Sequence, residues 1–129
     1  MVKEQGLSVS MNAKLIGSGE ETLVLAHGYG ADQSIWDKVL PLLIQKYQVL
    51  VFDWSFAGTI KDPDLFDAEK YSSYDAFADD LVALMDEMKL SSSVFVGHSM
   101  SAMVGCIASI KRPELFKRLV LVGGSPMYV

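Results

Sequence analysis

The segment 94–103 constrains the fold most, because an apolar run there meets a serine-bearing turn and an apolar helical pattern follows at once. Residues 94–96 are typical of a buried strand. Small residues, Gly97 and Ser101, stand two positions before and after Ser99. This is the layout of a nucleophile elbow, in which a serine lies on a strained strand-to-helix turn with its hydroxyl above the sheet. The alternative is an ordinary strand–turn–helix in which Gly-x-Ser occurs by chance.

Four nearly continuous apolar runs predict parallel strands that are covered on both faces. They are residues 22–26, 48–52, 93–96 and 118–122. Segments with helical periodicity lie between them, at residues 35–43, 74–88 and 100–110. Pro41 indicates a kink or break in the first of these segments. The alternation predicts an α/β fold with a parallel sheet and crossover helices.

The parts outside these runs are less regular. Residues 7–16 predict two short strands that form an antiparallel hairpin at the sheet edge. Ser72, with Asp75 three residues later, resembles a capping box at the start of a helix. The long connection 55–73 has no clear period, and we expect it to be a surface excursion beside the mouth of a site. We interpret Asp53, at the end of its strand, as a structural carboxylate that hydrogen-bonds this loop rather than as a catalytic acid.

Composition argues against several classes of function. The 129 residues carry a net charge of −5, which argues against nucleic-acid binding as a main role. No apolar stretch approaches the ~18–20 residues of a membrane span, and residues 1–6 lack the apolar core of a signal peptide. The one cysteine, Cys106, lies in an apolar helical pattern and is interpreted as a buried small hydrophobe. No metal-binding or cofactor-binding motif is present, so we expect no metal and no cofactor.

A second glycine-bracketed turn follows the first long strand, at residues 26–30. It can direct the backbone N–H of Tyr29 into the space above the strand ends. An oxyanion hole needs a second donor, the N–H of the residue after the nucleophile, which here is Met100. Met100 also opens a helix, whose dipole favours an anion at the same place. Both turns lie at the carboxyl ends of strands, where open α/β sheets bind ligands. The alternative is a glycine-rich turn that serves backbone geometry only.

Four segments together resemble the plant strigolactone and karrikin receptor group of α/β-hydrolases. They are residues 28–36, 97–103, 112–116 and 125–129, and the resemblance runs from about residue 8 to the end of the chain. A serine at the position of Ser101, in place of a second elbow glycine, is also usual in that group. Residues 52–58 resemble its less studied receptor-like branch. The resemblance implies that Ser99 is the nucleophile, that the backbone of Tyr29 and Met100 forms the oxyanion hole, and that Tyr128 joins these three in lining the ligand cavity.

The sequence departs from that group in lacking a base for the serine. In this fold the order is Ser, then Asp or Glu, then His, whereas both histidines, His27 and His98, precede Ser99. The catalytic Asp and His of the group, its helical lid and its C-terminal strands would follow Val129. We therefore expect residues 1–129 to be the N-terminal portion of a single α/β-hydrolase core domain, inactive by itself, with an exposed apolar edge strand.

Three functional hypotheses remain open. In the first, the complete protein is a receptor with slow serine-hydrolase activity, of the carboxylic-ester type, on a butenolide-like small molecule, and its lid recruits a signalling protein. In the second it is a general esterase without a signalling partner. In the third the chain is a non-catalytic truncated product. The absence of a targeting signal predicts a cytoplasmic location, and the resemblance implies access to the nucleus. From the net charge and the apolar pattern we expect neither a nucleic-acid nor a membrane partner.

Overall fold

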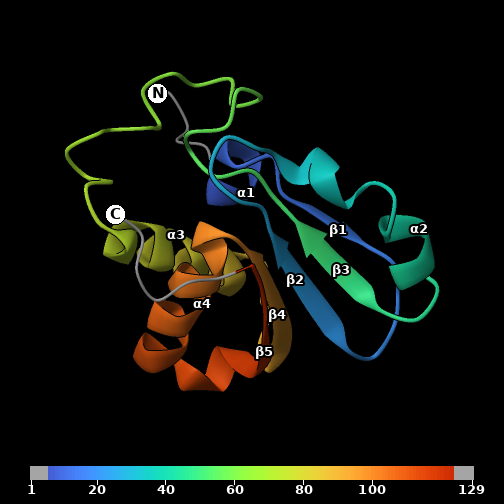
Figure 1. The fold of residues 1–129 in the computed structure, drawn as a ribbon. Helices are drawn as coiled ribbons and strands as arrows, with labels where there is room; N and C mark the ends of the chain where they lie inside the picture. Colours follow the sequence, from blue (N-terminus) through green and yellow to red (C-terminus); the bar gives the residue numbers. More distant parts are fainter. Residues whose placement is uncertain (1–5, 124–129) are drawn as a thin grey trace.

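The computed structural model describes residues 6–123, which form one five-stranded sheet with helices on both faces (Figure 1). The strands lie in the order β1-β3-β2-β4-β5, and only β1 runs antiparallel to its neighbour. Their bounds are β1 Lys14–Ile16, β2 Thr22–Ala26, β3 Gln48–Val51, β4 Ser93–His98 and β5 Phe116–Val122. The predicted α/β fold and its four parallel strands are confirmed.

The helices divide between the two faces of the sheet. Five helical elements follow the first, α1 Leu7–Ser10; they are η1 Gln33–Trp36, α2 Leu40–Leu43, α3 Tyr74–Glu87, α4 Met100–Lys111 and η2 Pro113–Leu115. In Figure 1, α1, α3 and α4 lie on one side of the sheet and α2 on the other. The predicted break at Pro41 is confirmed, because the segment 35–43 consists of a 3₁₀ turn and a short helix with Pro41 in its first turn.

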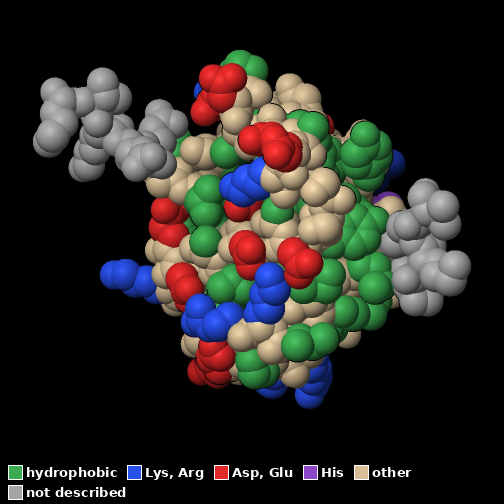
Figure 2. Space-filling view, turned by 90° about the vertical axis from the view of Figure 1, so that its left-hand side faces the viewer, with side chains coloured by type: hydrophobic (Ala, Val, Ile, Leu, Met, Phe, Trp, Pro, Cys, Tyr) green, Lys and Arg blue, Asp and Glu red, His purple; other side chains and the backbone are tan. Residues whose placement is uncertain are grey.

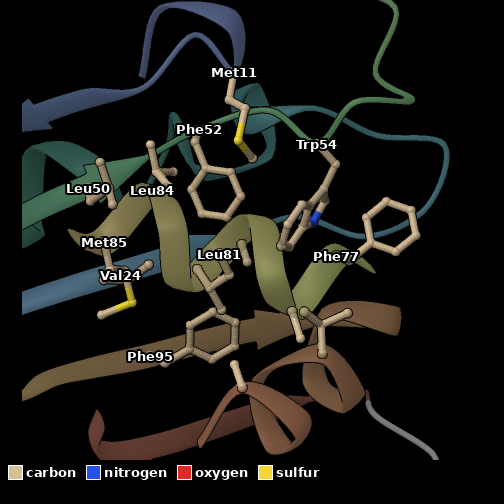
Figure 3. Packing of buried hydrophobic residues seen from close by; sticks show 14 of the residues in the cluster. Met11, Val24, Leu50, Phe52, Trp54, Phe77, Leu81, Leu84, Met85 and Phe95 are labelled. Atoms are coloured by element: carbon tan, nitrogen blue, oxygen red, sulfur yellow. The ribbon is translucent and has the colours of Figure 1, made fainter. Parts of the chain in front are cut away.

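The larger core lies between the sheet and helices α3 and α4. Alternate strand residues point into it, since successive side chains of a strand face opposite sides. Figure 3 shows Trp54 beside Phe77 of α3, and Phe95 of β4 beneath Leu81. All four side chains are buried. On the other face of the sheet, the remaining strand residues, among them Leu23 and Leu25, pack against η1 and α2. The nearly continuous apolar pattern of the strands therefore reflects cover on both faces.

The predicted N-terminal hairpin is wrong. Residues 14–16 form the expected antiparallel edge strand, but Leu7–Ser10 form the helical turn α1 instead of a partner strand. The cause is a tertiary contact: the carboxylate of Glu87 on α3 accepts hydrogen bonds from the backbone N–H of Leu7 at 3.0 Å and of Ser8 at 2.6 Å. These are N–H groups that the first turn of a helix leaves without partners.

The predicted cap of α3 is also displaced. Ser73, not Ser72, is the N-cap residue, with an extended backbone at φ −139° and ψ 167°. It makes no side-chain capping hydrogen bond, so the capping box is not formed. Asp75 lies in the first turn of the helix, where the helix dipole stabilises a negative charge.

The outer surface of α3 and α4 is charged. Figure 2 turns this side toward the viewer and shows acidic and basic side chains close together. Lys111 of α4 forms ion pairs with Asp75 and Asp79 of α3. At the sheet edge, by contrast, β5 exposes Val120, Leu121 and Val122. Within residues 6–123 no helix has the length and apolarity needed to cross a membrane.

Candidate active site

Ser99 lies at the turn between β4 and α4 in a left-handed backbone conformation, with φ 61° and ψ −126°. Such a conformation costs a non-glycine residue about 1–3 kcal/mol and persists where the surrounding structure imposes it. Here the backbone N–H of Ser99 donates a hydrogen bond of 2.9 Å to the carbonyl of Val122 on β5. The geometry is that of the strained strand-to-helix turn predicted from the sequence.

Two glycines allow the chain to pass close to this turn. A Cβ on Gly97 would lie 2.6 Å from the carbonyl oxygen of Ser101 and 2.7 Å from the ring of Phe95. A Cβ on Gly28 would lie 2.8 Å from the Cβ of Ser99. The turn after β2 therefore packs directly against the turn after β4, as both elbow and oxyanion-hole hypotheses require.

Ser101 connects these two turns through its hydroxyl. Its Oγ donates to the backbone carbonyl of His27 and accepts from the indole Nε1 of Trp54 at 2.8 Å. The same indole N–H lies 3.0 Å from the carbonyl of His27. All three residues are buried. A serine at this position, where a glycine is more usual, thus supplies a hydrogen-bonded contact that joins the segment after β2, the segment after β3 and α4.

The ring of His27 is fully buried and both of its nitrogens are engaged. Its Nε2 accepts a hydrogen bond from the backbone N–H of Trp54 at 3.0 Å, and its Nδ1 lies 2.9 Å from the carbonyl oxygen of Gly28. Because Nε2 accepts, the proton must be on Nδ1, and the imidazole is neutral. Burial lowers the pKa of His27 below its ordinary value of 6.5. The sequence-based conclusion that His27 is not the base is consistent with this role as a structural link.

The structure brings three of the four predicted site residues together. Tyr29, Ser99 and Met100 line one pocket of about 360 Å³. Tyr29 is 79% exposed, whereas Met100 is buried at the start of α4. The fourth predicted residue, Tyr128, lies outside the described residues. His98, the elbow residue before Ser99, is exposed.

Five further residues line the same pocket and were missed by the sequence-based prediction. All are aromatic and come from the long connection and the start of α3: Phe56, Phe66, Tyr71, Tyr74 and Phe77. The connection was expected to be a surface excursion, and its residues 61–64 are indeed exposed. Its ends, however, pack against α3. The density of aromatic residues between positions 56 and 77 is the signal that could have revealed this wall.

Asp53 has the structural role predicted for it. Its carboxylate accepts hydrogen bonds from the side chain of Asn12 at 2.9 Å, the backbone N–H of Gln33 at 2.8 Å and the hydroxyl of Thr59 at 2.6 Å. It therefore ties the long connection to two other loops. It also lines a more open cavity of about 680 Å³ that does not include Ser99.

Metal chemistry has no candidate among residues 6–123, where no group of three or more His, Cys, Asp or Glu side chains is placed to hold an ion. Cys106 is partly buried on α4 and is not in a disulfide. Its partial exposure differs from the full burial expected: the buried residues in this part of α4 are Val104, Gly105 and Ala108.

Residues 21–129 match the alpha/beta hydrolase fold family, and the chain belongs to that family. It is 51% identical over 92% of its length to karrikin insensitive 2 receptor CA of Petunia hybrida, and 45% identical over 93% to strigolactone esterase RMS3 of Pisum sativum. The chain spans 43% and 45% of these relatives, less than half of either. The resemblance to the strigolactone and karrikin receptor group is thereby confirmed.

Solved structures agree with the fold. The hydrolase olei00960 of Oleispira antarctica superposes with a TM-score of 0.88 and 32% identity, over 93% of this chain and 44% of that one. The esterase of Exiguobacterium antarcticum superposes with a TM-score of 0.77 over 88% of this chain and 41% of that one. At 22% identity, the second likeness concerns the fold only.

Proposed function

We propose that Ser99 is the nucleophile of a serine hydrolase of the carboxylic-ester type, and that the complete protein binds and slowly hydrolyses a butenolide-like small molecule. One observation carries the proposal: Ser99 has the strained backbone of an elbow and lines the same pocket as Tyr29 and Met100. The names of the related receptor and esterase support the ligand class.

The chemistry follows from the placement of these groups. The Oγ of Ser99 attacks the carbonyl carbon, its proton passes to a base, and the carbonyl electron pair moves to oxygen. The backbone N–H groups of Tyr29 and Met100, with the N-terminus of α4, stabilise that oxyanion. The C–O bond to the leaving group then breaks and the leaving oxygen takes the proton. Water hydrolyses the acyl-enzyme and returns the proton to Ser99.

The base is not His27, since both its ring nitrogens are engaged in hydrogen bonds within the core. In the alpha/beta hydrolase order the Asp or Glu and the His follow the serine. We therefore assign both to the part of the relatives' length that this chain does not span. It follows that the 129-residue polypeptide by itself should be inactive, because an unactivated serine loses most of its reactivity.

The proposal includes the cellular role that the family resemblance implies. In this proposal Tyr128 contributes to the ligand cavity of the complete protein. The lid of the complete protein recruits a signalling protein in the cytoplasm and nucleus. The second candidate is a general esterase without such a partner, which the 32% identity to a bacterial hydrolase favours. A pull-down of ligand-dependent partners with the full-length protein separates these two, because the esterase hypothesis predicts no ligand-dependent capture.

The activity is tested by hydrolysis of 4-nitrophenyl acetate with the full-length protein. We expect turnover to fall by about a thousandfold or more in Ser99→Ala, in keeping with loss of a triad nucleophile. Ser18→Ala, at an exposed serine before β2, is the matched control and should leave the rate unchanged. Turnover that survives in Ser99→Ala would contradict the assignment of the nucleophile.

A further inference from the structure

The pocket beside Ser99 has an aromatic wall, which comprises Tyr29, Phe56, Phe66, Tyr71, Tyr74 and Phe77. The two other residues that line it are Ser99 and Met100. Among the described residues that line this pocket, none carries a charged side chain. Aromatic faces attract flat π-bonded groups in offset-stacked or edge-to-face contacts. The wall therefore favours an uncharged planar ligand over an anionic or puckered one.

Five rings of the wall contact one another in sequence. Tyr29 and Phe56 have centroids 5.1 Å apart, and Phe56 meets Phe77 edge-on at 5.9 Å. Phe77 in turn lies 4.6 Å from Tyr71, which stacks on Phe66 at 5.4 Å with an interplanar angle of 8°. Phe56 is the ring through which the exposed Tyr29 is joined to the buried part of the wall.

The buried part of the wall is fixed to α3. Tyr71 donates a hydrogen bond to Asp80, which is buried on that helix, and Phe77 belongs to the same helix. Tyr71 and Phe77 are therefore held by the core. Tyr29 and Phe66 are exposed at the rim, whereas Phe56 and Tyr74 are half-buried. Phe56 contacts both the exposed Tyr29 and the buried Phe77, so it is well placed to be both held in position and accessible to a ligand.

We infer that Phe56 is a specificity-determining residue of the pocket beside Ser99. Phe56 selects ligands with a flat, uncharged, unsaturated ring over ligands with a saturated ring of the same size. The inference rests on the proposed function, since it names the ligand feature that the same site recognises. Phe56 acts by contact with the ligand ring. It also supports Tyr29, whose backbone N–H is the proposed oxyanion donor.

The test compares two esters with the same leaving group in the full-length protein. 4-Nitrophenyl benzoate has a flat acyl ring and 4-nitrophenyl cyclohexanecarboxylate a puckered one. After each kcat/KM is divided by the uncatalysed rate, we expect the wild-type protein to favour the benzoate by about tenfold, the upper range for one aromatic contact. Phe56→Leu should reduce this preference to about twofold or less, and Phe56→Tyr should retain it.

Phe116→Leu is the matched control, because it removes a ring that contacts Phe95 at 5.9 Å and does not line the pocket. Its preference should equal that of the wild type. Thermal unfolding of each variant separates loss of selectivity from loss of fold. A Phe56→Leu protein that is folded and keeps the wild-type preference would overturn the inference while the proposed function stands.

Binding provides a readout that does not require turnover. Benzamide and cyclohexanecarboxamide, titrated against the full-length protein and followed by nuclear magnetic resonance, should show tighter binding of benzamide in the wild type and equal binding in Phe56→Leu. If Ser99-dependent turnover is absent, the proposed function fails and this pair decides the inference. Equal binding of the two amides by the wild-type protein would overturn it.

Discussion

A Cβ at Gly97 would lie 2.6 Å from the carbonyl oxygen of Ser101, the residue two positions beyond the proposed nucleophile. The obstacle is backbone at the start of α4 rather than the movable end of a side chain. The ring of Phe95 blocks the same position at 2.7 Å. The backbone geometry of the elbow therefore requires a residue without a Cβ at position 97.

Gly97→Ala should lower the free energy of unfolding by about 1–3 kcal/mol, the usual cost of overpacking a filled site. It should also reduce turnover, because the clash displaces the turn that holds Ser99. Urea unfolding and ester hydrolysis of the full-length protein measure the two effects. Gly58→Ala is the control: a Cβ there meets nothing within 4 Å, so stability should change by no more than about 0.5 kcal/mol. Equal stability of the two variants would show that the close packing at Gly97 is not present in solution.

The buried imidazole of His27 should make stability depend on pH. Because its folded-state pKa is lowered, its contribution is fully present above about pH 6.5, its ordinary value, and is lost as pH falls through the folded-state pKa. Protonation of Nε2 would break the hydrogen bond from Trp54. Unfolding monitored between pH 7.5 and 5 should therefore show decreasing stability on acidification.

Other titrating groups must be distinguished from His27 in this measurement. Carboxylates with lowered pKa values, such as Glu21 and Glu87, titrate below 4.5 and thus outside this range. Asp80 acts in the opposite direction, since its pKa is raised, so the measurement is repeated in Asp80→Asn. His27→Gln should be less stable at neutral pH by about 1–3 kcal/mol, because buried groups lose partners, and its stability should be flatter with pH. An unchanged pH slope in His27→Gln would refute the role given to the imidazole.

Asp80 and Tyr71 should be coupled. Burial raises the pKa of Asp80, against the opposing effects of the Tyr71 hydroxyl and of Lys70 at 3.7 Å. Tyr71→Phe removes the donor, so the carboxylate is left less satisfied and its pKa rises further. Stability should fall by about 1–3 kcal/mol at pH 7.

The sign of the pH effect tests this coupling. A raised folded-state pKa gives stability that is present at low pH and lost as pH rises through that pKa. The cost of Tyr71→Phe should therefore be smaller at pH 4.5 than at pH 7. In an Asp80→Asn background the same substitution should lose most of this pH dependence. A cost that does not vary with pH would mean that the hydroxyl acts on something other than the carboxylate.

The strands and the elbow could be predicted from local sequence because their determinants are local. Continuous apolar runs correspond to strands covered on both faces, and the bounds of β2 agree with the predicted 22–26. The elbow requires small residues two positions before and after Ser99, which are Gly97 and Ser101. The break at Pro41 likewise depends on one residue's missing N–H.

The sequence-based predictions were wrong or incomplete where contacts between distant residues determine the structure. Residues 7–10 alternate apolar and polar side chains as a strand does, but Glu87, 80 residues away, supplies partners for a helical turn. The aromatic wall depends on the packing of the connection 55–73 against α3, which periodicity does not encode. The hydrogen bonds that Ser101 makes with His27 and Trp54 also required three-dimensional placement.

The central claim is that the hydroxyl of Ser99 is the reactive nucleophile. The most direct measurement treats the full-length protein with a fluorophosphonate, which phosphonylates activated serines, and locates the adduct by mass spectrometry of peptides. The account predicts one modified residue, Ser99, and no adduct in Ser99→Ala. An adduct on another serine, or an unmodified Ser99 in protein that hydrolyses esters, would contradict it.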